Sequence, residues 1–469
     1  MKTILDFILE NKKQGQIAFR GAGHRGRADI FDQSGYGDFY HNMLAEDLTE
    51  ISGADTLARP SGLIRSTMEY YADLYGVVAS MLLVNGCGSG IHAAIQSCVP
   101  RGGKLILARN SNPAAFSALR MNNIKPVYMR PAWNEKYGIH GEITAAEVRM
   151  ACEDNHDATA VLITSPNVFG IMSDISAIAD VVHTYGMTLI VDQSHGAHLR
   201  FFDAVNNTSS AAEDLGADIV IDGTDETLLS LAGTGVMNVC TRRVDVEALE
   251  SQLAVFNESG HSYLAIGGLD VNEKILRRYG GEIINSWMED LRYAYHQLDA
   301  MSGVRVITAG NLDPTKINIS LASVGVSGAE LESELRKNNI YAQAVNGEYV
   351  LLSTAAGNRH EDYVTLVNTV KAMAENHGVG EVADRRTPLS PDFVLGYSNV
   401  PKECEAVPLY QADGRVLYDP IITYPPGAAI ACPGEIMNID VISYVAKALE
   451  REDVVIGVDD EGYIFVGKC

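Results

Sequence analysis

The chain has 469 residues, of which 46% are hydrophobic and 20% are charged. This is enough apolar material for more than one buried core, and it excludes a mostly disordered protein. The 36 Lys and Arg residues against 60 Asp and Glu residues give a net charge of −24. Such a surface repels phosphate backbones and anionic lipid, so we expect no nucleic-acid partner and no membrane association. The seven cysteines form no C-x-x-C pair, which argues against a zinc site and a disulfide framework and is typical of a cytoplasmic protein.

Between about residues 60 and 245, short apolar runs alternate with amphipathic stretches. Runs that are apolar throughout are expected where helices cover both faces of a parallel sheet. The stretch 173–186 is typical of one such helix, with Ser173 as N-cap and Gly186 at its end. We therefore expect an α/β domain with a mainly parallel, seven-stranded sheet. The predicted strands are 81–84, 104–108, 126–129, 160–164, 188–192, 218–222 and 236–240.

The second half of the chain predicts two smaller units. A helical stretch from about 270 to 301, weakened only by Gly280-Gly281, is predicted to link two domains. We expect an N-terminal segment 1–60, a large domain 61–300, a small α+β domain 301–377 and a C-terminal α+β domain 378–469. The stretch 377–391 is typical of a linker. Beyond residue 300 the predicted strands are 304–309, 316–322 and 349–354, and the predicted helices are 328–337, 361–376 and 439–450.

Three strand ends carry residue types suited to chemistry, and ligands of open α/β sheets bind outside the carboxyl ends of the strands. NGCGSGIHAAI (85–95) is a Gly-rich turn that opens a helix. It could hold an anion, or it could simply be a tight connection. IVDQSHGAH (190–198) ends a strand in an acid followed by two histidines, and IVIDGTDETLL (219–229) ends in a cluster of acids. These residues are expected to lie at one edge of the sheet.

Several segments, in order over nearly the whole chain, resemble the prokaryotic ornithine/lysine/arginine decarboxylases. They are GAGHRGR (21–27), DLTEISGADTL (47–57), RPSGLI (59–64), LLVNGCGSGIHAAI (82–95), ARNSNPAAFSAL (108–119), KPVYMRP (125–131), ITSPNVFG (163–170), VDQSHGAH (191–198), ADIVIDGTDETL (217–228), LDPTKINI (312–319) and YPPGAAIACPGE (424–435). The resemblance implies the type I fold of enzymes that depend on pyridoxal phosphate (PLP). It also implies a homodimer or higher homo-oligomer, and a link to amino-acid decarboxylation and polyamine metabolism.

The resemblance assigns roles to two of these strand ends. In the family, the acid at the position of Asp192 pairs with the pyridine nitrogen of PLP, and the histidine at the position of His195 lies near the cofactor. The phosphate-holding turn corresponds to residues 86–89, where Cys87 and Gly88 replace two hydroxyl residues and Ser89 remains. The family's acid-rich DEAHG reads DQSHG (192–196) here.

Other positions depart from the family. Its PLP-binding lysine lies in a Ser-x-His-Lys motif, which here reads Gly223-Thr224-Asp225-Glu226. Glu226 therefore stands for the lysine and Asp225 for the histidine, and no lysine occurs in residues 137–273. Asn112 replaces the histidine that stacks on the ring. A Schiff base needs an amine, so we expect no covalently held PLP and at most weak binding. Each added carboxylate would also repel the phosphate by roughly 3 kcal/mol at about 5 Å and an effective dielectric of about 20.

Four functions remain open. The first is a PLP-free pseudoenzyme that is a partner or regulator of an active decarboxylase, including as a heteromer with an active paralogue. The second is a binding module for a basic amino acid or polyamine in an acidic pocket. The third is an enzyme with other acid–base chemistry, and the fourth is a residual or altered amino-acid decarboxylase, a lyase. The candidate site residues are Gly86, Cys87, Gly88, Ser89, Asn112, Asp192, Ser194, His195, Thr224, Asp225 and Glu226.

We assign no metal site, and we leave two further motif residues outside the candidate site. A metal held by Asp192, His195, Asp225 and Glu226 is not expected. Lys316, in LDPTKINI, and His24, in GAGHRGR, are interpreted as parts of the framework.

Overall fold

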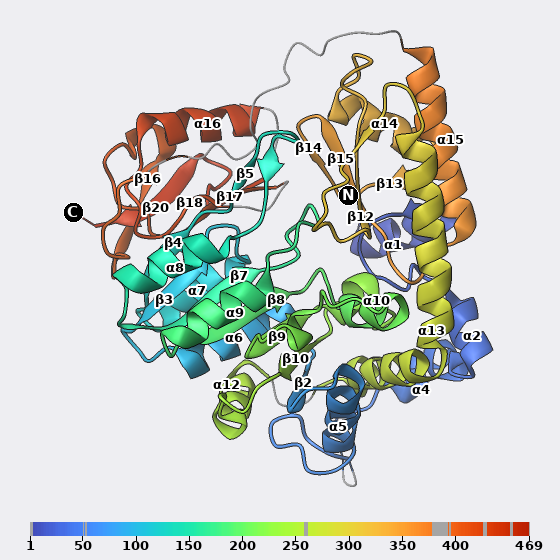
Figure 1. Cartoon of the computed structure of the whole chain (residues 1–469), viewed down its shortest axis with the longest axis horizontal. Coiled ribbons are helices and arrows are strands. Elements are labelled where there is room, and N and C mark those ends of the chain that lie inside the picture. The colour runs from blue at the N-terminus through green and yellow to red at the C-terminus, as the bar shows by residue number, and fades with distance from the viewer. Residues whose placement is uncertain are drawn as a thin grey trace.

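The computed structural model describes residues 3–49, 51, 54–257, 261–377, 393, 395–424, 429–450 and 454–468. A large α/β unit lies beside a small unit that carries α14 and α15, and the C-terminal unit with α16 lies against the large one (Figure 1). The boundaries 60, 300 and 377 between these units stay a prediction.

One seven-stranded sheet forms the centre of the large unit, in the order β2-β10-β9-β8-β7-β3-β4. The edge strand β2 and the other five strands run in one direction, and β10 runs opposite to both of its neighbours. Each of the seven predicted apolar runs forms one of these strands, so the expected mainly parallel sheet is confirmed. The strands are β2 (Ala79–Leu83), β3 (Lys104–Ala108), β4 (Lys125–Met129), β7 (Ala158–Thr164), β8 (Thr188–Gln193), β9 (Ile219–Asp222) and β10 (Gly235–Val239).

Helices cover both faces of this sheet, which is why its strands are apolar on both sides. Separate buried clusters of apolar side chains lie on the two faces. The first face is covered by α6 (Cys87–Cys98), α7 (Pro113–Met121) and α12 (Val246–Phe256), and the second by α8 (Ala145–Asp154) and α9 (Ile175–Thr184). The hairpin of β5 (Trp133–Asn134) and β6 (Ile139–His140) lies between β4 and α8 in the chain.

The prediction that Ser173 caps helix α9 is wrong. Its N-cap is Asp174, whose Oδ1 accepts the N–H of Ala177 at 3.0 Å. Ser173 was the predicted cap, but its Oγ instead accepts the N–H of Ile143 at 3.1 Å. Both residue types favour N-caps, so a tertiary contact decided between neighbours. Gly186 follows the helix with φ +72°, as expected for a helix end.

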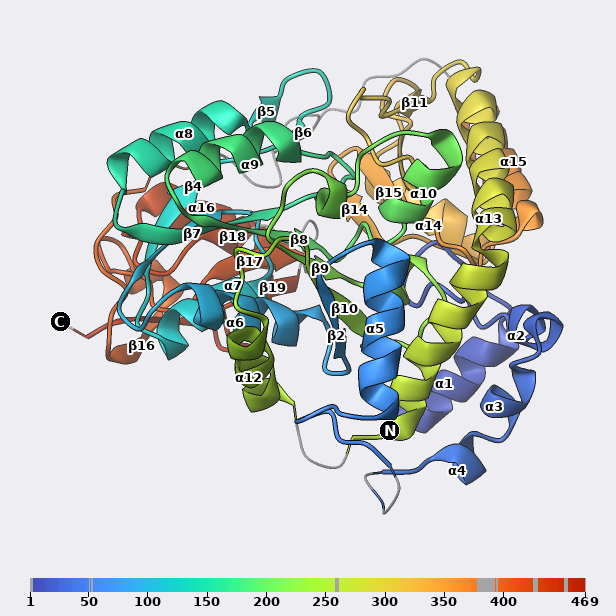
Figure 2. The same cartoon turned by 60° about the horizontal axis from the view of Figure 1, so that its bottom comes forward.

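Helix α13 (Tyr263–Asp299) joins the large and small units. It begins earlier than predicted, at the cap Ser262, and Gly280-Gly281 does not interrupt it. One end packs against α5 (Leu63–Tyr75) and the middle against α10 (Leu199–Asn206), and it also contacts α15 (His360–Asn376) (Figure 2). The indole Nε1 of Trp287 donates to Thr354 Oγ1 at 3.0 Å, which links the helix to the small unit.

The small unit is built on a four-stranded antiparallel sheet, in the order β11-β12-β15-β14. The N-terminal segment packs on it, because β1 (Ile17–Ala18) pairs with β13 (Ile340–Tyr341). The elements are β11 (Arg305–Val306), β12 (Lys316–Ser320), α14 (Gly328–Lys337), β14 (Ala344–Asn346) and β15 (Tyr349–Ser353). The N-terminal helices are α1 (Ile4–Lys13), α2 (Ala28–Ser34), α3 (Gly37–His41) and α4 (Met43–Glu46).

The C-terminal unit is α+β, as expected. Its elements are β16 (Cys404–Pro408), β17 (Ile421–Tyr424), β18 (Ala429–Ala431), α16 (Ile439–Glu450), β19 (Val454–Ile456) and β20 (Tyr463–Gly467). The predicted linker 377–391 lies outside the described residues except for His377.

A buried ion pair fastens this unit to the large sheet. Arg109, directly after β3, pairs with Glu435 and donates to the carbonyl of Ile430 at 2.9 Å. Glu435 also accepts the N–H of Cys432 at 2.7 Å. Both charged side chains are more than nine-tenths buried. Because water does not reach these two charges, each depends on the other as its partner, and the pair holds the C-terminal unit against the large sheet.

We predict that Arg109→Met lowers the free energy of unfolding of the C-terminal unit by about 3–5 kcal/mol, because it leaves the Glu435 carboxylate buried without its cation. Urea titration followed by limited proteolysis measures this. Lys468→Met, which removes an exposed pair with Glu403, is the matched control and should cost less than about 1 kcal/mol. Equal unfolding midpoints for the two variants would contradict the prediction.

Candidate functional site

A pocket of about 390 Å³ lies at the carboxyl ends of the central strands. It brings together nine of the candidate site residues from the sequence: Gly86, Cys87, Gly88, Asn112, Asp192, Ser194, His195, Asp225 and Glu226. The other two are turned to neighbouring groups. Ser89 Oγ donates to the carbonyl of Gly86 at 2.8 Å, and Thr224 Oγ1 shares a 2.8 Å hydrogen bond with Ser230 Oγ.

The Gly-rich turn enters α6 through a conformation that favours glycine. Gly86 has φ +74° directly before the first residue of the helix, Cys87. Burial raises the pKa of the Cys87 thiol well above its usual range, so the thiol stays protonated. The turn therefore offers the helix N-terminus, but no reactive sulfur, to the pocket.

Asp192, at the end of β8, is held within the pocket wall. It is 2% exposed, and it accepts hydrogen bonds from the backbone N–H and the hydroxyl of Ser194. Burial raises its pKa, while the Ser194 bonds oppose the shift. Asn112 is likewise engaged, because its Oδ1 accepts the N–H of Ala114 at 2.9 Å and so caps α7.

An ion pair between His195 and Glu226 lies at the centre of the site. His195 follows β8, Glu226 lies in α11 (Thr224–Thr227) after the adjacent β9, and Nδ1 of the imidazole donates to Oε2 of the carboxylate at 2.6 Å. Glu226 raises the pKa of His195, and burial only partly opposes this. Burial alone would raise the pKa of Glu226, but His195, and beyond it Lys316 and Arg25, outweigh burial and lower it. Each partner therefore favours the charged form of the other.

Asp225, beside this pair, is bonded to the backbone. Its Oδ2 accepts the N–H of Gly233 at 2.7 Å, and its carbonyl accepts the N–H of Gly23 at 2.6 Å. Burial, with Glu226 adding to it, raises the pKa of Asp225 to about 6. The side chain is thus a carboxylate that can take up a proton just below neutral pH.

Sequence reasoning missed several pocket residues. Asn110 Oδ1, Ser111 Oγ and Thr164 Oγ1 are buried atoms without a hydrogen-bond partner, and all three residues line the pocket. Buried polar groups are normally paired, so these three suit a polar occupant. Their only sequence signal was a position just after, or at the end of, an apolar strand. The other missed residues are Pro113, His140, Asn167, Val168, Phe169 and Gln343.

The interpretation of Lys316 as framework alone is incomplete. Its ammonium donates to Ser353 Oγ at 2.8 Å, and the residue lines a small crevice together with His195 and Glu226. Burial lowers the pKa of Lys316, while Asp313 and Glu226 oppose the shift. His24 accepts the N–H of Gly26 at its own Nδ1, at 3.0 Å, a contact within its own turn.

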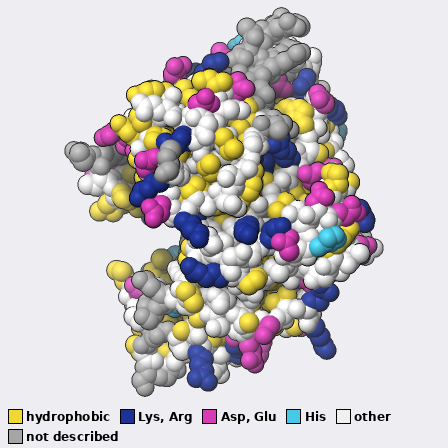
Figure 3. Space-filling model, turned by 90° about the vertical axis from the view of Figure 1, so that its left-hand side faces the viewer, with side chains coloured by type: hydrophobic (Ala, Val, Ile, Leu, Met, Phe, Trp, Pro, Cys, Tyr) yellow, Lys and Arg dark blue, Asp and Glu magenta, His cyan; other side chains and the backbone are white. Residues whose placement is uncertain are grey.

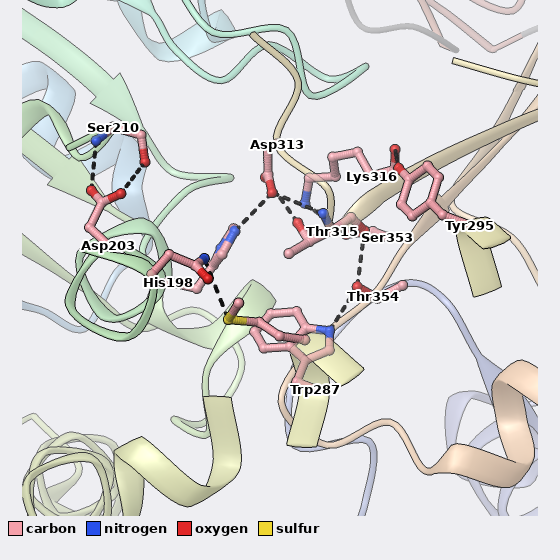
Figure 4. Close-up of polar contacts among 12 residues, drawn as sticks. His198, Asp203, Ser210, Trp287, Tyr295, Asp313, Thr315, Lys316, Ser353 and Thr354 are labelled. Atoms are coloured by element: carbon pink, nitrogen blue, oxygen red, sulfur yellow. Dashed lines mark hydrogen bonds and ion pairs between the residues drawn. The ribbon is translucent and has the colours of Figure 1, made fainter. Parts of the chain in front are cut away.

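The second histidine of IVDQSHGAH joins two units (Figure 4). His198 is fully buried, and its Nε2 forms a 3.0 Å hydrogen bond with Asp313 Oδ1. Asp313 also accepts the N–H and the hydroxyl of Thr315, both at 2.9 Å. This contact brings the start of β12, and Lys316 with it, against the large unit.

Solved structures with a similar fold define the class. The constitutive lysine decarboxylase of Escherichia coli matches with a TM-score of 0.76 and 17% identity, over 93% of this chain and 78% of that one. Lysine decarboxylase A of Pseudomonas aeruginosa matches with a TM-score of 0.75 and 17% identity, over 99% and 80%. The chain therefore has the type I fold of PLP enzymes, as the resemblance implied.

Sequence profiles give the family. The profile described as Orn/Lys/Arg decarboxylase, major domain, matches residues 4–309, and that of the C-terminal domain matches residues 396–459. The chain belongs to the Orn/Lys/Arg decarboxylase family. An arginine decarboxylase of Bacillus anthracis is 28% identical over 97% of this chain and 94% of its own length. An uncharacterised protein of Bacillus subtilis is 25% identical over 96% and 95%.

In the part of the chain that the structure describes, no helix is long and apolar enough to cross a membrane.

Two buried acids, Glu213 and Asp222, lie next to Gln193 at the end of β8. Gln193 Nε2 donates to Glu213 Oε2 and to Asp222 Oδ1, both at 3.0 Å. Burial raises the pKa of both carboxyl groups, and Asp222 and Glu213 also interact directly. The pair is therefore most stable when it keeps a proton.

We predict that the free energy of unfolding falls as pH rises above the ordinary carboxyl range of about 4. Above that pH the folded state holds a proton that the unfolded chain has lost, so stability decreases by up to about 1.4 kcal/mol per pH unit and proton until the raised pKa is passed. Glu213→Gln should remove much of this slope in urea titrations at several pH values. Glu375→Gln, at an exposed position of α15, is the control, and an unchanged slope in Glu213→Gln would refute the assignment.

Proposed function

We propose that this chain is a pseudoenzyme of its family, which holds no PLP through a Schiff base and acts as a partner or regulator of an active decarboxylase. The observation that carries the proposal is Glu226, which stands where the family resemblance puts the PLP lysine. Its carboxylate forms an ion pair with His195 at 2.6 Å. A carboxylate cannot form a Schiff base, and the ion pair gives this one another role.

The neighbouring side chains also support a site without covalent PLP. Asn112 uses its side chain to cap α7. This is the role of a helix cap and not that of a group stacked on the PLP ring. Ser89, the hydroxyl that remains in the phosphate turn, donates to the carbonyl of Gly86. Asp192 and His195 keep the residue types that the resemblance gives to the family, but Asp192 is bound by Ser194 and His195 by Glu226. The residues present therefore do not fit a covalently held PLP, and we assign no reaction step to it.

The other functions have weaker support. An acidic pocket for a basic amino acid or polyamine needs free carboxylates, but Glu226 is held by His195 and Asp192 by Ser194. An altered decarboxylase would need another amine, and none lies in residues 137–273. Lys316 is the lysine beside the site, and its ammonium is bound to Ser353. Acid–base chemistry by His195 would require it to leave its ion pair.

Assembly into homo-oligomers, in the cytoplasm, is part of the proposal. Apolar side chains of α1 are strongly exposed, among them Leu5 at 63% and Ile8 at 55%, and Leu44 in α4 is 97% exposed. Apolar groups gathered in this way are typical of a surface that another chain covers. On the face drawn in Figure 3, which is the left-hand side of the molecule in Figure 1, apolar side chains are instead mixed with charged ones. The N-terminal helices are therefore the surface that we assign to assembly.

We predict that the unchanged protein holds no PLP covalently. Purified protein incubated with PLP and then reduced with borohydride should show no visible aldimine band and no gain of mass. In Glu226→Lys an amine replaces the carboxylate beside His195, so we expect a reducible band and one added PLP on most chains. Absorbance spectra and intact mass measure both.

Glu226→Arg is the matched control, because it adds the same charge without an amine that forms imines at neutral pH. It should gain no mass. A reducible adduct in the unchanged protein would overturn the proposal, and peptide mapping would then name the lysine, with Lys316 examined first.

A further prediction concerns partners. By light scattering, the protein should have at least about twice its chain mass of 50.7 kDa. Co-expressed with an active arginine or lysine decarboxylase of the family, it should co-purify with that enzyme and change its rate. Leu5→Glu combined with Ile8→Glu should reduce both the mass and the co-purification, because charges would then lie in the apolar contact.

Met150→Glu, at an exposed position of α8, is the control and should leave assembly unchanged. A monomer at micromolar concentration, together with no co-purification and an unchanged rate of the active enzyme, would end the proposal of a partner role.

A further inference from the structure

Cations from three separate parts of the chain act on the Glu226 carboxylate: His195 is bonded to it, Lys316 lines the same crevice, and Arg25 is bound to Ser353 in the wall of that crevice. His195 follows β8 in the large unit, Lys316 begins β12 in the small unit, and Arg25 lies in the N-terminal segment. Each of the three acts to lower the pKa of Glu226. In its sequence motif Glu226 is an added negative charge, but the fold supplies positive charges near it.

The cations are held in place by groups other than Glu226. Lys316 Nζ donates to Ser353 Oγ at 2.8 Å, and Arg25 Nη2 donates to the carbonyl of Ser353 at 2.7 Å. Arg25 Nη1 also donates to the carbonyls of Gly21 at 2.9 Å and Ala22 at 3.0 Å. Ser353 therefore brings both cationic groups to one point on the small unit.

This point faces the site directly. A small crevice of about 20 Å³ is lined by His195, Glu226, Lys316 and Ser353, among others. The N-terminal segment is fastened at the same place, because Gly23 donates its N–H to the carbonyl of Asp225 at 2.6 Å. The crevice is thus a meeting point of the large unit, the small unit and the N-terminal segment.

Other acids act on the same cations, but each is bound to further groups. Asp362, which acts on Arg25, accepts the N–H of Arg359 at 2.9 Å. Asp225, which acts on His195, accepts the N–H of Gly233 at 2.7 Å. Asp313 also acts on Lys316, but it is shared with His198 and Thr315. Asp192 also acts on His195, but its carboxylate is bound by Ser194. Removing the negative charge at 226 would leave buried cations short of a counter-ion, which is costly.

We propose that His195, Lys316 and Arg25 form a carboxylate-binding site that Glu226 occupies from within the chain, and that a small monocarboxylate such as formate or acetate binds there when this side chain is shortened. The inference deepens the proposed function, because a site that carries its own anion needs no anionic cofactor to balance its cations. It does not depend on whether the protein has a partner.

Glu226→Ala tests this site, since it removes the carboxylate and leaves room for a formate ion. Without added ligand, the variant should unfold at least about 2 °C lower than the unchanged protein. Sodium formate should restore the loss in a saturable manner, and sodium chloride at equal ionic strength should not. The unchanged protein should show no difference between the two salts.

Two further variants complete the experiment. Glu226→Gln fills the same space without charge, so formate should not stabilise it, and NMR titration should show a lower pKa for His195 than in the unchanged protein. Glu226→Ala combined with Lys316→Met should lose the formate effect. If Glu226→Ala does not fold, the His195 titration in Glu226→Gln decides the question.

The proposal is overturned if formate has no more effect than chloride on Glu226→Ala, or if the pKa of His195 is unchanged in Glu226→Gln. Failure here is distinct from failure of the proposed function. Uptake of PLP by the unchanged protein would reject the pseudoenzyme, whereas absence of formate rescue would reject only the carboxylate site.

Discussion

The ion pair between His195 and Glu226 is the interaction on which the character of the site depends. It exists because β8 and β9 are adjacent and parallel, with Gln193 opposite Asp222. Residues shortly beyond the two strand ends therefore meet at the same edge of the sheet. A carboxylate placed there without a cation would be costly to bury. The sheet register thus converts an unfavourable substitution into a paired one.

Much of the fold could be predicted because buried strands have a distinctive composition. All seven apolar runs are strands of the central sheet, and α14 and α16 have the predicted bounds. The misses lie where two local signals compete. Ser173 and Asp174 are both good N-caps, and only the contact of Ser173 with Ile143, far from it in the chain, decides between them. Local sequence does not contain that information.

Some residues of the site could likewise be predicted from local sequence, and others could not. The pocket residues of the large unit follow apolar strands, so strand ends and motif order located Asp192, His195 and Glu226 before the structure did. Lys316 lies in another unit, and its approach to Glu226 depends on how the units pack, which the His198–Asp313 contact helps to determine. No pattern within LDPTKINI indicates that neighbour. The electrostatics of Glu226 could therefore not be judged from its own motif.

Net charge is a poor guide to such a site. The chain carries −24 overall, yet the carboxylate at position 226 is paired with His195 and stabilised by the charges of Lys316 and Arg25. Buried charges respond to near neighbours, whereas charges on the distant surface are screened. A lysine at this position would add a fourth cation and would require an anion from outside. Glutamate balances the positive charges near this position without a ligand. In the proposed pseudoenzyme, a carboxylate in place of the amine would also reduce the electrostatic need for an anionic cofactor, so a site without covalent PLP is compatible with a stable fold.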